Sequence, residues 1–174
     1  MNTQTLPFQK QRINAILHDR KYQSCYNEIC ACERNRVFCH HDMGHFLNVA
    51  RLAMIFYLKE KDTEQPDEQI EDLIYATALL HDIGRHIQYL DGTRHEIASA
   101  DIASEILKRC DFNETESRLV IEAILQHRNP EVREEASLCG WIYRADKMSR
   151  SCFACPAEAM CDWKNDKKNL ELNY

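Results

Sequence analysis

Glycine and proline are scarce in this sequence, with four of each among its 174 residues. So few turn-forming residues argue against an all-β chain and favour long helices with short connections. No segment reaches the roughly 18 consecutive apolar residues of a membrane span, and residues 1–10 lack the charged-then-apolar order of a signal peptide. The sequence therefore predicts a cytoplasmic protein without a membrane partner.

A surplus of basic residues is also missing, because the formal net charge is -6. A protein that binds duplex nucleic acid usually carries a basic patch, so no duplex nucleic acid is expected as a partner. The length suits one domain with its own hydrophobic core. We expect a single all-α bundle of six or seven helices, followed by a short cysteine-bearing tail.

Apolar residues recur with helical spacing along most of the chain. Residues 8–17 and 21–36 are predicted to be helices, within an N-terminal part (1–37) that packs on the bundle. Residues 38–150 are predicted to form the bundle and 151–174 the tail, all as one structural domain. Further helices are expected to begin at His45, to lead from a first turn at 66–68 to His81, to begin at His95, to lie between 113 and 127, and to run over about 132–149. Residues 62–69 and 88–94 are predicted to be loops.

Side chains that can bind a metal recur at the ends or apolar faces of five predicted helices. An adjacent His and Asp end the run Leu-Leu-His-Asp, where burial would be costly without a partner. Any one of these residues alone would be explained by a structural hydrogen bond, but six at core-facing positions indicate a shared metal site. The six are His45, His81, Asp82, His95, His127 and Asp146. Imidazole and carboxylate ligands of this kind suit Zn, Fe, Mn, Ni or Co, and Mg remains a further candidate.

The order of these motifs resembles the HD-domain superfamily of metal-dependent phosphohydrolases. The matching segments are His45 in His-Phe-Leu-Asn-Val-Ala-Arg, the doublet in Leu-Leu-His-Asp-Ile-Gly-Arg, and Asp146 in Arg-Ala-Asp-Lys-Met-Ser. The resemblance covers about residues 38–150. It implies an all-helical fold in which His45, His81, Asp82 and Asp146 bind one divalent metal.

His95 and His127 resemble the additional ligands of HD proteins that hold two metals. The resemblance then implies that Asp82 bridges the two ions. A single ion, with His95 and His127 contacting the substrate phosphate, is an equally open interpretation. HD proteins that cleave cyclic diguanylate carry a Gly-Tyr-Pro segment after the histidine equivalent to His127, and here the chain reads Arg-Asn-Pro-Glu-Val instead. That substrate is therefore not supported.

The chemistry implied is hydrolysis of a small phosphate ester, with a nucleotide among the candidates, by a metal-activated water. Asp82 would orient the water as well as bind metal, and Arg85 would offset phosphate charge unless it is simply an exposed arginine at a helix end. Weaker candidates for phosphate contact are His86, Arg94, Arg128 and Lys147. His41 could in principle chelate an ion together with His45, four residues later, but the resemblance favours His45 as the ligand. His40 and His41 are therefore interpreted either as loop residues or as residues that support the ligands. Two other functions stay open, a di-iron HD-type oxygenase and a non-catalytic metal or redox sensor.

Nine cysteines in a reducing compartment do not indicate a disulfide framework. Three of them, Cys152, Cys155 and Cys161, form a C-x2-C-x5-C pattern directly after the predicted helix of Asp146. Such spacing suits zinc or an iron–sulfur cluster if a fourth thiolate is available. Cys39 is the first choice for the fourth ligand, with Cys30 and Cys32 as alternatives. The competing interpretation is a set of ordinary buried or exposed thiols.

Overall fold

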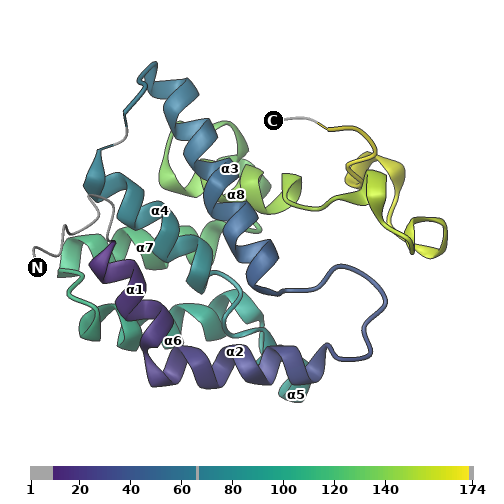
Figure 1. Ribbon diagram of the computed structural model, residues 1–174, viewed down its shortest axis with the longest axis horizontal. Helices are drawn as coiled ribbons and strands as arrows, with labels where there is room; N and C mark the ends of the chain where they lie inside the picture. The colour runs from purple at the N-terminus through teal and green to yellow at the C-terminus, as the bar shows by residue number, and fades with distance from the viewer. Residues whose placement is uncertain (1–9, 66, 173–174) are drawn as a thin grey trace, which may run out of the picture.

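The computed structural model describes residues 10–65 and 67–172, and these residues form helices and loops without any strand (Figure 1). The predicted all-α fold is thereby confirmed. The α-helices of the described residues are α1 (Gln11–His18), α2 (Arg20–Cys32), α3 (Met43–Lys61), α4 (Glu68–Leu80), α5 (Arg85–Asp91), α6 (His95–Arg109), α7 (Glu114–Gln126) and α8 (Leu138–Met148). Four short 3-10 helices complete them: η1 (Pro130–Glu134), η2 (Cys152–Ala154), η3 (Glu158–Met160) and η4 (Asn165–Lys167).

Seven of these helices correspond to predicted ones, and α5 is an addition. It occupies part of the segment predicted as a loop over 88–94, and it ends at Gly92, whose φ of 84° suits glycine. The last helix is shorter than the predicted 132–149, because Val132 lies in η1 and a turn separates η1 from α8. Residues 8–9 of the first predicted helix, like the outer ends of the predicted parts 1–37 and 151–174, lie outside the described residues.

Side-chain caps explain where several helices begin. Asn113 and Glu116 form the predicted capping box at the start of α7, each bonding the other's backbone N–H. The Asp67 carboxylate caps α4 by accepting the backbone N–H groups of Gln69 and Ile70. At α3 the Asp42 carboxylate accepts the N–H of His45 at 2.9 Å, which places His45 in the first turn of the helix.

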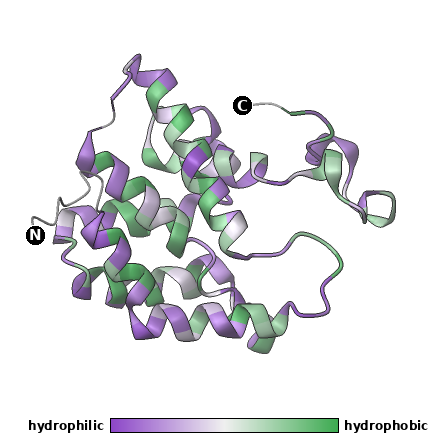
Figure 2. Cartoon of the chain, viewed as in Figure 1, coloured by the Kyte–Doolittle hydropathy of each residue, from purple (hydrophilic) through white to green (hydrophobic). Residues whose placement is uncertain are grey.

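Helix α4 is the centre of the bundle. Seven of its last eight residues are buried, starting at Leu73, so it contacts other helices on nearly every side. Its neighbours include α3 and α8 on one side and α1 and α7 on others. Figure 2 shows the apolar residues concentrated where helices face one another and the polar ones on outer faces. The C-terminal end of α4, where His81 follows, is therefore enclosed by other helices.

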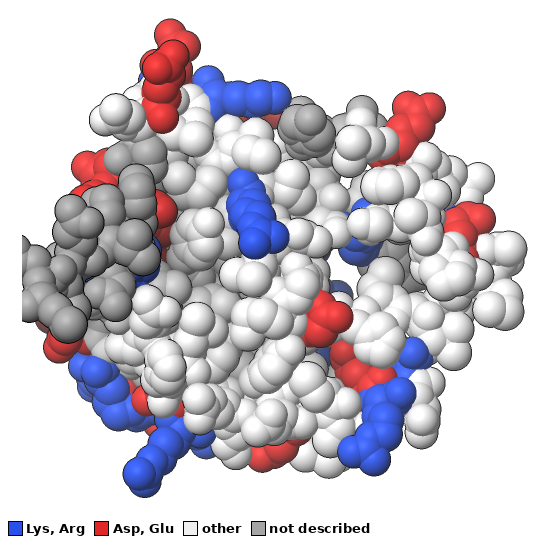
Figure 3. All heavy atoms as spheres, viewed as in Figure 1, with Lys and Arg blue, Asp and Glu red and all other residues white. Residues whose placement is uncertain are grey.

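Opposite charges are interspersed on the surface shown in Figure 3, without a continuous basic patch on that face. No helix among the described residues is both long enough and apolar enough to cross a membrane.

The tail after α8 lies to one side of the bundle (Figure 1). It consists of η2, η3 and η4 joined by turns, and none of these three short helices contains a buried residue. Asn169 ties the tail to the end of α8 by donating hydrogen bonds to the carbonyls of Lys147 and Arg150, at 2.8 and 2.9 Å. Little apolar packing therefore holds this segment.

Candidate metal centre

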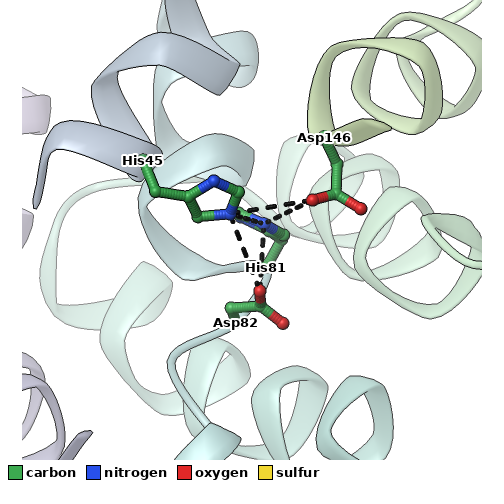
Figure 4. A group of neighbouring side chains, drawn as sticks. All are labelled: His45, His81, Asp82 and Asp146. Atoms are coloured by element: carbon green, nitrogen blue, oxygen red, sulfur yellow. Dashed lines mark hydrogen bonds and ion pairs between the residues drawn. The ribbon is translucent and has the colours of Figure 1, made fainter. Parts of the chain in front are cut away.

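Three helices and the turn after α4 bring four predicted ligands together (Figure 4). His45 extends from the first turn of α3, His81 is the C-cap of α4, and Asp146 lies near the end of α8. The Nε2 atoms of His45 and His81 are 3.3 Å apart. Oδ2 of Asp82 lies 3.8 Å from Nε2 of His45 and 3.4 Å from Nε2 of His81. Oδ1 of Asp146 is 3.7 and 3.9 Å from the same two nitrogens.

A second group uses the other oxygen of Asp82. Oδ1 of Asp82 lies 3.0 Å from Nε2 of His95 and 3.8 Å from Nε2 of His127. The two imidazole nitrogens are themselves 3.1 Å apart. His95 is the first residue of α6 and His127 the C-cap of α7. All six predicted metal-binding residues thus meet at one point of the bundle, with the Asp82 carboxylate between two groups.

A close approach between the turn after α4 and helix α6 makes this arrangement possible. A Cβ on Gly84 would lie 2.4 Å from the backbone N of Ser99, so only glycine fits without moving α6. The N–H of Gly84 also donates to Oγ of Ser99 at 2.8 Å. This contact fixes Asp82, two residues earlier, relative to the helix that carries His95.

Hydrogen bonds at Nδ1 orient the rings of His81 and His127 so that a lone pair on Nε2 points toward the centre. Nδ1 of His81 lies 2.8 Å from the carbonyl of Ala78, and Nδ1 of His127 lies 2.6 Å from the carbonyl of Ile124. A carbonyl can only accept, so each Nδ1 carries the proton and each Nε2 is left with a lone pair.

The same logic applies to His45. The Ser149 hydroxyl donates to the carbonyl of Asp146 at 2.8 Å, so its oxygen accepts from Nδ1 of His45 at 3.1 Å. His95 differs, since its Nδ1 lies near both Oε1 of Gln88 and Nη1 of Arg85.

Burial and charge set the protonation states. Burial lowers the pKa of His81 to about 3 and also lowers that of His127, because the imidazolium form is poorly solvated there. Burial alone would raise the pKa of Asp82, but His81 and His41 outweigh it and hold that pKa well below its usual value. The pKa of Asp146 is lowered in the same way, chiefly by Lys147 against the effect of burial. At neutral pH the site therefore offers ionised carboxylates at Asp82 and Asp146 and neutral imidazoles at His81 and His127, which are the metal-binding forms.

The pKa of His45 moves in the other direction. Burial would lower it, but the carboxylates of Asp82 and Asp146 outweigh burial and raise it. These carboxylates stabilise a positive charge at this point.

The six residues fit a metal. Oδ1 of Asp82 is buried without a hydrogen-bond partner, a costly state that coordination would relieve. The Nε2 atoms of His95 and His127 also lie 3.1 Å apart, a separation suited to two donors on one ion. Donors about 2.1 Å from one ion stand roughly 3.0–3.4 Å apart in octahedral or tetrahedral geometry. The separations within both groups are close to that range, so each group can hold a divalent ion.

Arg85 reaches the same centre. Its Nη2 lies 2.8 Å from Nε2 of His41, and its Nη1 lies 2.7 Å from Nδ1 of His95. Its Nε is buried without a hydrogen-bond partner. None of the carboxylates in the described part of the chain lies within ion-pair distance of it, so its charge is free to meet an anion.

His41 lies beside this centre, which agrees with the second of its two interpretations, a residue that supports the ligands. Its Nε2 lies 3.6 Å from Oδ2 of Asp82. Glu33 of the loop after α2 holds it from behind, accepting the backbone N–H of His41 at 2.7 Å and contacting Nδ1 as well. Tyr89 donates to the same carboxylate at 2.6 Å. Burial would raise the pKa of Glu33, but His41 outweighs it and the pKa falls to about 2.

The weaker candidates for phosphate contact have other partners. His86 is buried and lies near the carbonyl of Ile83 and the carboxylate of Glu28. Arg94 and Arg128 are both exposed and ion-paired with Glu96. Lys147 pairs with Asp146 and with the carbonyl of His127. His40 is exposed and lies 3.9 Å from Glu33.

Sequence reasoning missed Ser149, Glu33 and Gln88, which position the imidazoles. Ser149 follows Asp146 by three residues on α8, so helical spacing offered a signal for it. Glu33 and Gln88 gave no such signal, because each meets its histidine only through the tertiary fold.

The structure favours Cys39 over Cys30 and Cys32 as the fourth candidate thiol ligand. Cys39 lines one cavity together with the three cysteines of the tail pattern, Cys152, Cys155 and Cys161. Cys30 and Cys32 are exposed on α2 and do not line it. All nine cysteines, each among the described residues, are free of disulfide bonds.

Comparison with known proteins gives two similarities. Residues 43–151 match the sequence profile described as HD domain. An uncharacterized protein of Clostridium beijerinckii (strain ATCC 51743 / NCIMB 8052) is 40% identical over 163 residues, covering 94% of this chain and 99% of that relative. No solved structure matches the chain. The profile match includes His45, His81, Asp82, His95, His127 and Asp146.

Proposed function

This chain belongs to the HD domain family, and from that membership and the geometry of its centre we propose that it is a metal-dependent phosphohydrolase. Its proposed substrate is a small phosphate ester, with a nucleotide among the candidates. One structural observation supports the proposal in addition to family membership. The Asp82 carboxylate lies between two groups of imidazoles, while the unpaired cation of Arg85 reaches the same histidines.

His45, His81, Asp82 and Asp146 would hold one divalent ion, and Asp82, His95 and His127 would hold a second. When bound, such ions supply Lewis acidity, which lowers the pKa of water to about 7 and polarises a phosphoryl oxygen. Two ions in neighbouring positions suit phosphoryl displacement, since they stabilise both the attacking and the leaving oxygen. The bridging position of Asp82 favours two ions over one.

Arg85 is the proposed anion-binding group. A guanidinium presents several N–H donors in a plane and matches the oxygens of a phosphate. Here imidazoles and the Gln88 amide are its hydrogen-bond partners, and these neutral groups offset less charge than a phosphate would. Binding of a phosphate ester would therefore place its negative charge beside Arg85 and next to Asp82.

His41 is the proposed positioning residue for Arg85. Its Nδ1 contacts the Glu33 carboxylate, so its Nε2 presents a lone pair that accepts from Nη2 of Arg85 at 2.8 Å. This contact would hold the guanidinium beside Asp82. Glu33 and Tyr89 act through His41 and are positioning residues.

Phosphate release from a panel of phosphate esters tests the proposal, with Mn, Co, Ni, Zn, Fe or Mg added to metal-free protein. We expect turnover that depends on the metal, and its loss in Asp82→Ala. Asp101→Ala on α6 is the matched control, since Asp101 is exposed and belongs to neither group. Full activity in Asp82→Ala would refute the assignment. Turnover only with iron and dioxygen would favour an oxygenase, and no turnover on any ester would favour a sensor.

A further inference from the structure

A cavity of about 410 Å³ lies between the loop before α3 and the tail. Cys39 and His40 line it from the loop, and Cys152, Cys155 and Cys161 line it from the tail. Figure 3 shows a hollow on the corresponding side of the molecule, between the tail and the bundle. Four thiols from two distant parts of the sequence thus line the same cavity.

The tail lacks the apolar packing that would hold it in this position. From Cys152 to residue 172 only Ala157 is a buried residue. A segment without a hydrophobic core usually needs a covalent or metal cross-link to keep one conformation. The cysteines of the tail form no disulfide. A bound metal group at the thiols would supply the missing cross-link.

Two cations line the same cavity. Arg150 stacks on the Trp163 ring, with Cζ 4.4 Å from the ring centroid, and no described carboxylate lies within ion-pair distance of it. Lys168 has a side chain only 7% exposed and pairs with Glu158 at 2.8 Å. Four thiolates around a metal group give a net negative charge, and Arg150 would offset part of it, whereas Lys168 is already paired with Glu158, which lines the cavity as well.

The thiols are spread more widely than the ligands of a single zinc ion. A single tetrahedral zinc holds thiolates about 3.8 Å apart, given Zn–S bonds of about 2.3 Å. Within the described residues, no three cysteine sulfurs gather within 4.8 Å of one another. In a four-iron cluster each thiolate binds a different iron, so the sulfurs stand farther apart around a larger space.

From these observations we propose that Cys39, Cys152, Cys155 and Cys161 bind a [4Fe–4S] cluster. Each thiol loses its proton on binding iron, and Arg150 offsets part of the resulting charge. The cluster joins the tail to the loop before α3. Because Cys39 precedes His41 by two residues, the cluster also holds His41 beside Asp82. The proposal does not depend on the phosphohydrolase activity.

Anaerobic purification of the full chain, followed by iron and acid-labile sulfide analysis, tests the cluster. We expect about four sulfides per chain and the broad visible absorption of an iron–sulfur protein. Sulfide is the decisive quantity, because iron at the His/Asp groups brings none. Asp82→Ala should lose the metal of those groups and keep the full sulfide content.

Serine variants of the four cysteines identify the ligands. Cys39→Ser, Cys152→Ser, Cys155→Ser and Cys161→Ser should each lose most of the sulfide and the visible absorption. Cys32→Ser is the matched control, an exposed thiol ahead of the same loop, and should keep both. Absence of sulfide from the wild-type chain, with or without bound zinc, would overturn the proposal. Equal loss in Cys32→Ser would overturn the choice of ligands, and a circular dichroism spectrum of each variant checks that the bundle is intact.

Discussion

The hydroxyl oxygen of Ser149 lies 3.1 Å from Nδ1 of His45, joining the end of α8 to the start of α3. The Ser149 hydroxyl donates a hydrogen bond to the carbonyl of Asp146, a predicted ligand near the end of α8. Ser149 therefore fixes the tautomer of one ligand and the backbone position of another. Groups that hold a ligand in this way typically change metal affinity by 10–100-fold.

Ser149→Ala should weaken divalent metal binding by about 10–100-fold while the protein stays folded. The expected cause is that His45 loses the acceptor which keeps its Nε2 free. Titration of metal-free protein with Mn or Co, followed by calorimetry, measures the change. Ser104→Ala is the control, because Ser104 is a half-buried serine away from the centre whose hydroxyl donates to the carbonyl of Asp101 in its own helix. Unchanged affinity in Ser149→Ala would show that Ser149 does not position His45.

His127→Ala and Asp146→Ala should each remove one of two bound ions, whereas Asp82→Ala should remove both. Each residue belongs to one group of donors, while Asp82 belongs to both. We expect two divalent ions in the wild-type chain, one in either single variant and none in Asp82→Ala. Mass spectrometry under native conditions counts the ions directly. One ion in the wild type that persists in His127→Ala would instead assign His95 and His127 to substrate binding.

Arg85→Gln should reduce kcat/KM by about 10²–10³-fold, the usual cost of losing a group that stabilises transition-state charge. Metal content should stay the same, because Arg85 is not a ligand. Initial rates on the best ester, together with metal analysis, measure both quantities. Arg94→Gln is the control, since Arg94 is exposed and paired with Glu96. A loss of metal in Arg85→Gln would mean that Arg85 acts by positioning His95 and not by binding phosphate.

Gly84→Ala should destabilise the protein by about 1–3 kcal/mol, the range for overpacking a tight contact. The new Cβ would meet backbone atoms of α6 at Ser99 and Ala98, which cannot move without shifting His95. Chemical denaturation measures the free energy of unfolding. Gly44→Ala is the control, because a Cβ there meets only side-chain atoms of Asp42 within 4 Å. Equal stability of the two variants would contradict the close approach.

The Glu33 carboxylate should make stability depend on pH in the acidic range. Its pKa is lowered from 4.5 to about 2 in the folded protein, so the unfolded chain binds a proton more readily. The stabilisation is complete above pH 4.5 and is lost as the pH falls toward 2. Denaturant titrations of metal-free protein across this range measure the slope. Glu33→Gln should cost about 1–3 kcal/mol at pH 7 and flatten the slope, and an unchanged slope would contradict the assignment.

The sequence by itself predicted the helical architecture because its signals are local. Few glycines and prolines, periodic apolar residues and the capping pair of Asn113 and Glu116 all act within a few residues of one another. Local signals were weaker at α5, where Asp91 and Gly92 indicated a turn. There the turn residues end a short helix that begins at Arg85, so the predicted loop was too long.

The six candidate ligands were also identified from the sequence, since the order of their motifs is distinctive. The sequence left open whether these residues bind one ion or two. Only the fold shows that the two oxygens of Asp82 face different groups of histidines, because that depends on where α6 and α7 end relative to α4. The sequence likewise left open whether His41 is a loop residue or supports the ligands, because its contact with Arg85 joins residues far apart in the chain.

Residue types and their spacing along helices thus determined the all-α class and the candidate metal ligands. Tertiary structure alone decided that Arg85 has no carboxylate partner among the described residues, that Ser149 holds His45, and that Cys39 faces the tail cysteines across a cavity. The physical reason is that periodicity records the buried face of a helix, whereas the meeting of side chains across the bundle depends on how the helices pack.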